Sequence, residues 1–162
     1  MTWTLRKAVP ADRAVIDALF VEMLRTIFHT ENVKDYEDGC LDRFFSGGEE
    51  WICVAQEGET VVAFLSIEVH REETDYLYLD DLSVTAAYRN CGIGTALIHT
   101  AEQYAEQICI PVIVFHVEKT NTDARRLYER LGYAAYRDDG NRVLMRKDAA
   151  WAAAPPRVCC TD

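Results

Sequence analysis

The chain has 162 residues, a net charge of −10 at pH 7, and a composition that is 49% hydrophobic and 27% charged. These values are typical of one folded domain, which at this size needs no metal or disulfide to fold. The longest apolar runs, such as Pro111–Phe115, are much shorter than the ~20 residues that a membrane helix requires. No apolar signal core follows Met1, and we therefore expect a cytoplasmic protein.

The acidic residues are concentrated in one part of the chain. Residues 31–81 hold 15 acidic and three basic side chains, a balance of −12, whereas the rest of the chain has a balance of +2. Such an acidic region disfavours nucleic acid and favours a cationic small molecule as the ligand. A solvated acidic face that only aids solubility is the alternative interpretation.

The first half of the chain predicts a hairpin-rich region with one long helix. Apolar residues alternate where strands are expected, and they recur at three and four positions along the expected helix. A Gly-containing turn between two β-rich runs is typical of a hairpin. In chain order we predict a strand over 3–9, a helix from Pro10 through Ile27, a shorter helix over 35–45, paired strands over 51–56 and 60–69, and a strand over 75–84.

The second half alternates strands and helices, which predicts one α/β domain over residues 1–148 with helices on both faces of a mixed sheet. Residues 149–162, rich in Ala and Pro, predict a loose tail. The cysteines form no C-x-x-C pair and accompany no His at zinc-finger spacing, so we expect no metal. In chain order we predict a helix over 92–108, a strand over 112–117, a helix over 121–131 closed by a left-handed Gly132, and strands over 133–137 and 142–146.

Two glycines open the helix that is predicted at residue 92. Gly92 and Gly94 have no side chain, so a ligand can approach the backbone there. The N–H groups of a helix N-terminus carry a partial positive charge, and Arg89 adds a cation just before them. The turn Arg89–Gly94 is therefore typical of a pyrophosphate site, although a helix start whose glycines only ease packing has the same pattern.

Two segments resemble the motifs of the GCN5-related N-acetyltransferase (GNAT) superfamily. Leu82-Ser83-Val84, followed by the run from Tyr88 to Leu97, is similar to its cofactor motif. The run from Asn121 to Tyr133 resembles its second motif, N-x-x-A-x-x-x-Y-x-x-x-G-F/Y. Two motifs in the order and spacing of the superfamily are more specific than either alone, and the resemblance covers residues 3–147.

The resemblance implies a mixed, mostly antiparallel sheet that is splayed between its fourth and fifth strands, which end at Val84 and Val117. Acetyl-CoA would be the co-substrate in that splay, with no metal. The backbone of Leu82, Ser83 and Val84 would pair with the pantetheine arm. Asn121, Ala124 and Tyr128 would also lie beside the cofactor. The pyrophosphate would be held by Arg89, Asn90, Cys91, Gly92, Ile93, Gly94 and Thr95, where Asn90 and Cys91 replace the more usual glycine-and-basic pair.

The resemblance also implies direct attack by an amine in a ternary complex, which needs a proton acceptor and a proton donor. Tyr128 would protonate the leaving thiolate, whereas by its helix position alone it would be expected in the core. Asp80, Asp81 and His116 compete as the base. Each also has a structural interpretation as a hydrogen-bond partner. Because strand residues alternate, we expect Asp80 and Asp81 on opposite faces, unless a bulge near Leu82–Val84 changes the alternation.

No recognisable motif specifies the acceptor, and three functions are compatible with the sequence. The motifs and the acidic region favour an N-acetyltransferase for a small cationic amine such as a polyamine or an aminoglycoside, the latter being an antibiotic-resistance activity. A peptide or protein N-terminal acetyltransferase would need Glu31–Phe45 to leave room for the peptide. Tyr128 argues against a non-catalytic acyl-CoA-binding module. We expect neither nucleic acid nor membrane as a partner, and the resemblance makes a homodimer one expected assembly.

Overall fold

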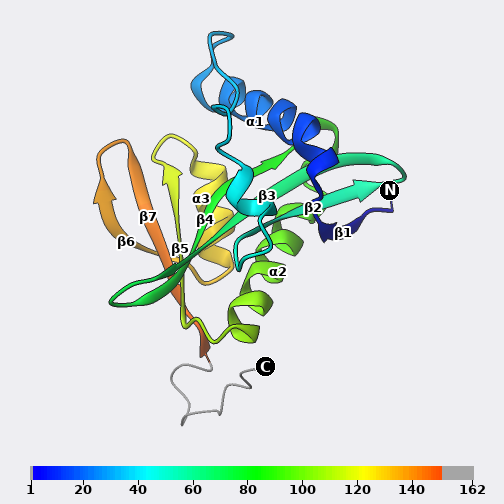
Figure 1. The fold of residues 1–162 in the computed structure, drawn as a ribbon. Helices are drawn as coiled ribbons and strands as arrows, with labels where there is room; N and C mark the ends of the chain where they lie inside the picture. Colours follow the sequence, from blue (N-terminus) through cyan, green and yellow to red (C-terminus); the bar gives the residue numbers. More distant parts are fainter. Residues whose placement is uncertain (1, 151–162) are drawn as a thin grey trace. The chain divides into compact units, whose positions relative to one another are not determined.

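The computed structural model describes residues 2–150 and contains a seven-stranded sheet in the order β1-β2-β3-β4-β5-β7-β6 (Figure 1). The predicted tail from residue 151 onward lies outside the described residues. The strands are β1 Thr4–Lys7, β2 Trp51–Glu57, β3 Thr60–Arg71, β4 Asp75–Val84, β5 Val112–Glu118, β6 Ala134–Asp139 and β7 Arg142–Asp148. The helices are α1 Arg13–Phe28, α2 Ile93–Gln107 and α3 Thr122–Arg130, with short 3-10 helices η1 Pro10–Asp12, η2 Asp42–Phe45 and η3 Ala86–Tyr88.

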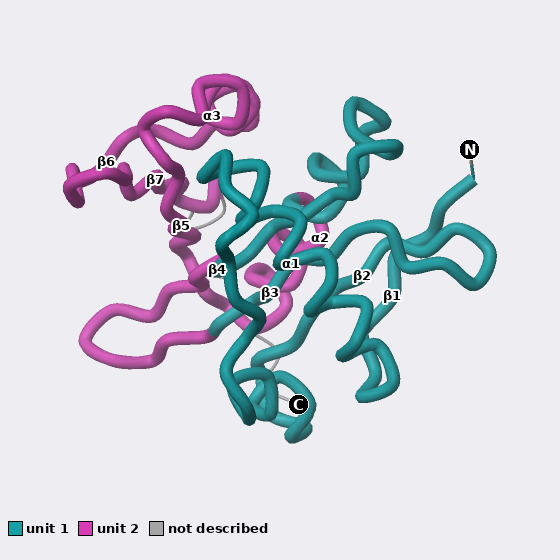
Figure 2. The backbone as a smooth tube through the Cα atoms, turned by 90° about the horizontal axis from the view of Figure 1, so that it is seen from above, with its two compact units in different colours: residues 1–68, 80–98 teal, residues 69–79, 99–162 magenta. Residues whose placement is uncertain are grey.

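The chain divides into two compact units, coloured separately in Figure 2. Unit 1 comprises residues 1–68 and 80–98, and unit 2 comprises residues 69–79 and 99–162. Strands β3 and β4 and helix α2 each contribute residues to both units.

Unit 1 is built on an antiparallel arrangement of β1, β2 and β3, in which Leu5 pairs with Ala55 and Val54 pairs with Phe64. Helix α1 covers one face of these strands, because its buried Ile16 and Leu19 pack in one apolar cluster with Phe64 and other strand residues. The helix that the sequence predicts from Pro10 begins instead at Arg13, after the separate 3-10 turn η1 Pro10–Asp12.

The helix predicted over residues 35–45 is wrong except for its last turn, η2. Gly39 adopts φ +78°, a left-handed angle that interrupts a right-handed helix. Upstream of it, the ring of Tyr36 stacks on Phe20 with 3.9 Å between centroids, and its hydroxyl bonds to Asp81. Contacts distant in sequence therefore override the local helical pattern in this segment.

Unit 2 contains the parallel pairing of β4 with β5, which consists of the pairs Leu77–Ile113 and Tyr78–Val114. A ladder confined to the first half of β4 agrees with the predicted sheet that splays between its fourth and fifth strands. Strand β5 also pairs antiparallel with β7 along its whole length, and β7 pairs with β6. The mixed, mostly antiparallel sheet is thus confirmed.

Lys147 on β7 joins three elements of unit 2. Its Nζ lies 2.5 Å from Glu102 Oε2 on α2 and donates to the carbonyl of Leu131, at the end of α3, over 2.8 Å. It also lies 5.5 Å from the centroid of the Tyr133 ring. Gly132 follows with φ +96°, as predicted for the residue that closes a helix. The lysine stem fills the space beside it, because a Cβ at Gly132 would meet Lys147 Cε at 3.3 Å.

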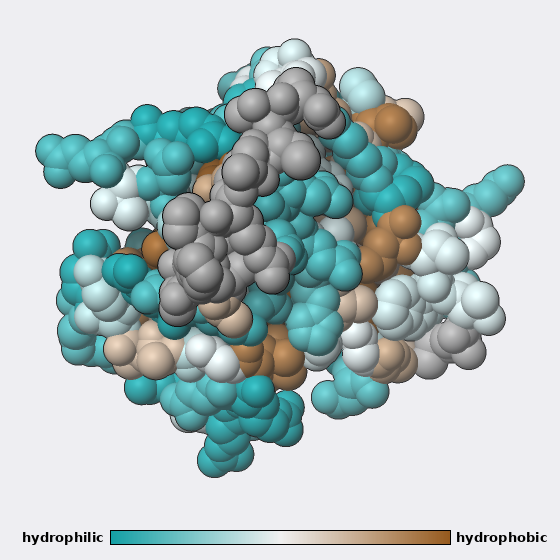
Figure 3. All heavy atoms as spheres, turned by 90° about the horizontal axis from the view of Figure 1, so that it is seen from below, coloured by the Kyte–Doolittle hydropathy of each residue, from teal (hydrophilic) through white to brown (hydrophobic). Residues whose placement is uncertain are grey.

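The surface seen in Figure 3 is mostly hydrophilic, with apolar side chains in scattered groups. The large apolar side chains that are exposed within residues 2–150 include Val9, Phe28 and Tyr136. Among the helices of the described residues, none combines the length and the apolar character needed to cross a membrane.

Candidate active site

The turn Arg89–Gly94 in unit 1 has the backbone geometry of an open helix start. Asn90 and Gly92 adopt φ +60° and +83°, which turn the chain sharply before α2. The first helical hydrogen bond runs from the N–H of Ala96 to the carbonyl of Gly92. The N–H groups of Ile93, Gly94 and Thr95 precede that bond and so stand outside the intrahelical ladder. This arrangement can accept an anion.

The two glycines of the turn are not required by packing. A Cβ added at Gly92 or Gly94 would meet no heavy atom within 4 Å. The side chain of Ile93 between them is buried and anchors the helix start in the core. The space beside the glycine backbone is therefore available to a ligand, and the residues fit the pyrophosphate of coenzyme A.

The segment before the turn is held by side chains of unit 1. Ser83 is buried and donates from Oγ to the carbonyl of Leu19 over 2.9 Å. Leu82 and Val84 are half-buried on β4. Arg89 donates from Nε to the carbonyl of Val84 over 3.1 Å, so in this structure that carbonyl has a protein partner.

Glu22 on α1 fastens the start of the turn and was not foreseen from the sequence. Its carboxylate accepts from Thr85 Oγ1 and from the backbone N–H of Ala86, both at 3.0 Å. It also lies 3.7 Å from the guanidinium of Arg89. The half-exposed Cys91 donates weakly to the carbonyl of Arg89. A helix far back in the chain thus orients the cationic residue of the turn.

Three carboxylates of unit 1 form one acidic cluster, which we define as Glu68, Asp80 and Asp81. Glu68 is buried at the end of β3 and accepts from Arg43 over 3.0 Å. Asp80 shares a hydrogen bond with Glu68, and Asp81 also interacts with the Glu68 charge. The placement of Asp80 and Asp81 on opposite faces of the strand stays a prediction, although the charges of both interact with that of Glu68.

Tyr36 reaches the same acidic cluster from the segment before η2. Its hydroxyl donates to Asp81 Oδ2 over 2.5 Å. Burial and the charges of Asp81 and Asp80 raise the pKa of this phenol far above its usual range, so Tyr36 stays protonated. The segment 31–45 is thereby attached to β4.

The acidic cluster shifts the ionisation of its own members. Partial burial, followed by the charges of Asp81 and Glu68, raises the pKa of Asp80 to about 7, although Arg43 opposes the shift. Burial also raises the pKa of Asp81, against the hydrogen bond from Tyr36. Asp80 can therefore change its protonation state near neutral pH while its side chain remains accessible to solvent.

Tyr128 lies on α3 in unit 2, where its ring contacts Phe115 edge to face at 4.4 Å between centroids. Burial raises the pKa of its hydroxyl to about 12, so the group carries its proton at neutral pH. Within residues 2–150 no protein acceptor receives this proton. Asn121 caps α3 by accepting from the N–H of Ala124 over 3.3 Å, so these two predicted cofactor residues shape the helix start.

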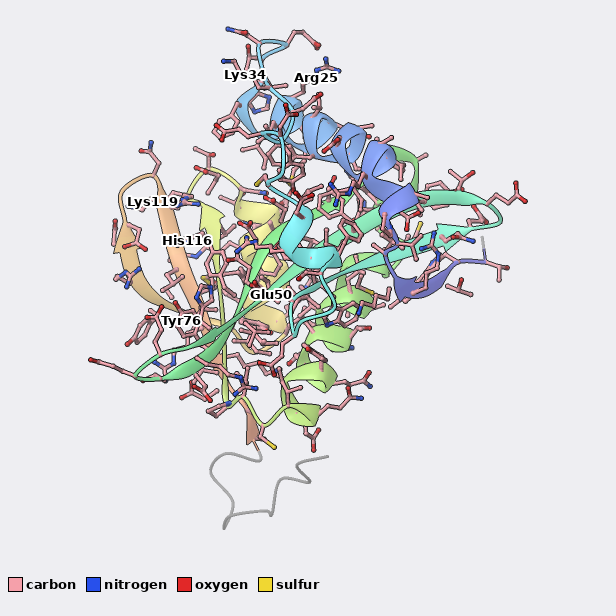
Figure 4. The ribbon with its side chains drawn as sticks, in the orientation of Figure 1. Arg25, Lys34, Glu50, Tyr76, His116 and Lys119 are labelled. Atoms are coloured by element: carbon pink, nitrogen blue, oxygen red, sulfur yellow. The ribbon has the colours of Figure 1, made fainter. Side chains whose placement is uncertain are left out.

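His116 lies near the end of β5 in unit 2 (Figure 4) and bonds through both ring nitrogens. Nδ1 lies 2.6 Å from the hydroxyl of Tyr78 on β4, and Nε2 lies 2.7 Å from Asp139 Oδ2 on β6. Arg137 donates to both oxygens of Asp139, at 2.8 and 3.0 Å. An imidazole held between a phenol and a carboxylate can accept a proton and stabilise the resulting charge.

A model of the acetyltransferase (GNAT) family matches residues 18–133, which include the turn, the acidic cluster, His116 and Tyr128. The chain belongs to this family. Acetyl-CoA is the acetyl donor of GNAT enzymes. No group of three or more His, Cys, Asp or Glu side chains in the described part of the chain is arranged to hold a metal ion.

Two curated GNAT relatives match about half of the chain. An uncharacterized N-acetyltransferase of Methanocaldococcus jannaschii is 36% identical over 86 residues, which cover 48% of this chain and 55% of that protein. The mycothiol acetyltransferase of Corynebacterium glutamicum is 31% identical over 77 residues, which cover 48% of this chain and 26% of that protein. The match thus spans between about a quarter and about half of these relatives.

Solved GNAT structures share the fold over most of the chain. PaiA N-acetyltransferase of Thermoplasma acidophilum, in complex with coenzyme A, has a TM-score of 0.75 at 16% identity, covering 91% of this chain and 99% of that one. Arabidopsis thaliana Naa50 in complex with a bisubstrate analogue has a TM-score of 0.72 at 18% identity, covering 91% of this chain and 99% of that one. An aminoglycoside acetyltransferase from a soil metagenome has a TM-score of 0.69 at 18% identity, covering 85% of this chain and 92% of that one.

Proposed function

We propose that the chain transfers the acetyl group of acetyl-CoA to a primary amine of a small cationic acceptor, such as a polyamine or an aminoglycoside, by direct attack in a ternary complex. The observation that carries the acceptor class is the acidic cluster of Glu68, Asp80 and Asp81. Carboxylates gathered at one place attract a cation, and an ammonium can compensate their mutual repulsion.

The attachment of Tyr36 favours a small acceptor over a peptide. A peptide acceptor requires the segment 31–45 to leave an open groove. In this structure Tyr36 stacks on Phe20 and donates to Asp81, so the segment is held against one of the carboxylates. A peptide would have to displace both interactions, whereas a small amine has less need to do so.

On the donor side, we propose that the turn Arg89–Thr95 holds the pyrophosphate and that Leu82–Val84 pairs with the pantetheine arm. Asn121 and Ala124 would lie beside the cofactor, as the resemblance to the superfamily implies. Tyr128 is the proton donor to the leaving thiolate. Its raised pKa, about 12, supports this role because the hydroxyl is fully protonated at neutral pH.

We assign the base to His116 among the three candidates. An amine must lose its proton before or during the attack, and His116 already bonds to an anionic partner, Asp139, that can stabilise the imidazolium. Asp80 and Asp81 then serve to bind the acceptor cation. Asp80, with a pKa of about 7, is the alternative base.

The test is a steady-state assay with acetyl-CoA and a panel of mono-, di- and polyamines, aminoglycosides and short peptides. We expect turnover of a cationic small amine, an increased KM for that amine in Asp80→Asn, and a kcat reduced by on the order of 100-fold in His116→Gln. If kcat were lost in Asp80→Asn but unchanged in His116→Gln, the base would be Asp80 instead of His116.

The same panel separates the alternative functions. Preferential turnover of a peptide, with a small amine acting only as a weak competitor, would show an N-terminal acetyltransferase. A thermal shift caused by acetyl-CoA without turnover of any amine or peptide would show a non-catalytic acyl-CoA-binding module.

A further inference from the structure

A chain of hydrogen bonds links four side chains of unit 2 in the order Tyr78, His116, Asp139 and Arg137. These residues come from β4, β5 and β6, and the strand ladders of unit 2 fix their positions. The side chains of His116 and Asp139 are 14% and 26% exposed. The order of these hydrogen bonds determines which atom carries each proton.

The carboxylate at one end fixes the tautomer of the imidazole. Hydrogen bonds from Arg137, and then from His116, lower the pKa of Asp139 to about 2, so the group is ionised and only accepts. Nε2 of His116 must therefore carry the hydrogen that it donates to Asp139. In the neutral ring Nδ1 then has a lone pair, which accepts the hydroxyl hydrogen of Tyr78.

We propose that Asp139 is a positioning residue that holds His116 as the Nε2–H tautomer, so that the acceptor's proton reaches His116 through the hydroxyl of Tyr78. The inference rests on the proposed function, in which His116 is the base. Asp139 touches no reacting atom. It acts only through the imidazole.

The proton transfer balances without a further reactant. The hydroxyl oxygen of Tyr78 takes a proton from the acceptor ammonium, directly or through one water, while the Tyr78 O–H proton moves to Nδ1 of His116. The amine becomes neutral, the imidazole becomes a cation, and Tyr78 keeps one proton throughout. The new positive charge lies 2.7 Å from the carboxylate of Asp139, which stabilises it.

Leu144 on β7 is the apolar residue paired opposite His116. Lys119, just beyond β5, pairs with Asp138 over 2.6 Å, so Asp138 is occupied elsewhere. The ring of Tyr78 also contacts His70 on β3 edge to face, and His70 in turn stacks on Tyr76 of β4.

The direct test is nitrogen NMR of the full chain labelled with ¹⁵N-histidine. The chain has four histidines, so the spectrum of His116→Gln assigns the His116 signals. We expect the Nε2–H tautomer in the native protein and a mixture of tautomers in Asp139→Asn. An Nδ1–H tautomer in the native protein would overturn the inference, and this result needs no variant of Asp139 to fold.

The kinetic test measures kcat and KM for Asp139→Asn, with Asp138→Asn as the matched control. Asp139→Asn should lower kcat by about 10- to 100-fold, as for other groups that orient a functional imidazole. The KM for acetyl-CoA should stay unchanged. Asp138→Asn removes the same charge one residue away and should leave kcat unchanged, and Asp139→Glu should restore part of kcat.

A second pair of variants tests the route through Tyr78. Tyr78→Phe should lower kcat at least as much as Asp139→Asn, whereas Tyr76→Phe, on the same strand and stacked on His70, should have little effect. Equal activity of the two variants would exclude the route through Tyr78. Unchanged kcat in His116→Gln would instead refute the base assignment itself, while the NMR result would still decide whether Asp139 sets the tautomer.

Discussion

Asp80 is a carboxyl of unit 1 whose ionisation depends on folding. A carboxyl whose pKa is raised to about 7 holds its proton more tightly in the folded chain than in the unfolded chain, where carboxyl groups titrate near pH 4. The folded state is therefore penalised as pH rises from about 4 to about 7. Asp80→Asn removes the penalty.

The expected result is a higher Tm than that of the native protein at pH 8, with a difference that shrinks towards pH 4. Thermal unfolding followed by circular dichroism measures both. Asp38→Asn, an exposed acid in the same half of the chain, is the control and should show no such trend. An equal gain at both pH values would mean that Asp80 ionisation is not the source.

Tyr128 and Tyr133 form a matched pair for testing the proton donor. Both rings contact Phe115, but only Tyr128 is proposed to reach the reacting sulfur. Tyr128→Phe should lower kcat by roughly 10²- to 10⁴-fold with little change in the KM for acetyl-CoA. Tyr133 has a buried hydroxyl without a hydrogen-bond partner, so Tyr133→Phe should keep kcat and stability. Similar kcat values for the two variants would show that Tyr128 only packs in the core.

At the scale of elements, a substitution at the start of α2 should affect stability and ligand binding in opposite directions. Gly94 is helical, and a Cβ there would meet nothing within 4 Å. Gly94→Ala should therefore stabilise the unliganded chain, by up to about 1 kcal/mol from helix propensity. The new methyl group would occupy space that we assign to the pyrophosphate, so the KM for acetyl-CoA should rise several-fold.

Thermal unfolding and initial-rate kinetics check the two effects of Gly94→Ala independently. Gly48→Ala, at a loop glycine that needs no left-handed angle, is the control and should leave that KM unchanged. A stabilised Gly94→Ala protein with native KM would show that the glycines serve only the helix start.

Most elements are predictable from sequence because their signals are local. The apolar pattern and the turn residues give β4 its observed bounds and α2 to within one residue at each end. The segment 35–45 is not predictable in this way, since Tyr36 is held by Phe20 and Asp81. Several contacts in the candidate site are likewise not predictable from a local sequence pattern. Glu68, Tyr78 and Asp139 each meet their partners through strand register, which no local pattern encodes.

At the scale of the whole molecule, the charge distribution predicts a dependence on salt. Residues 31–81 carry a balance of −12, and the acidic cluster lies at the end of that stretch. Raising ionic strength from about 0.1 M to about 1 M shortens the screening length from about 10 Å to about 3 Å. The kcat/KM for a cationic acceptor should fall accordingly.

Initial rates in increasing sodium chloride measure this effect, with a diamine and a monoamine compared side by side. The diamine should lose more kcat/KM than the monoamine, and the double variant Asp80→Asn/Asp81→Asn should flatten both slopes. If kcat/KM depended on salt equally for the diamine and the monoamine, the acidic region would serve only solubility.

Lys147 has a consequence for a protein that handles a reactive thioester. An acetyl donor also modifies unprotected lysine amines, whereas arginine guanidinium groups resist it. The chain contains four lysines and 13 arginines, so it offers few such targets. The Lys147 ammonium donates to Glu102 and to the carbonyl of Leu131, and in that state it presents no lone pair for attack. We therefore expect acetyl-CoA to acetylate Lys147 more slowly than a lysine without such contacts.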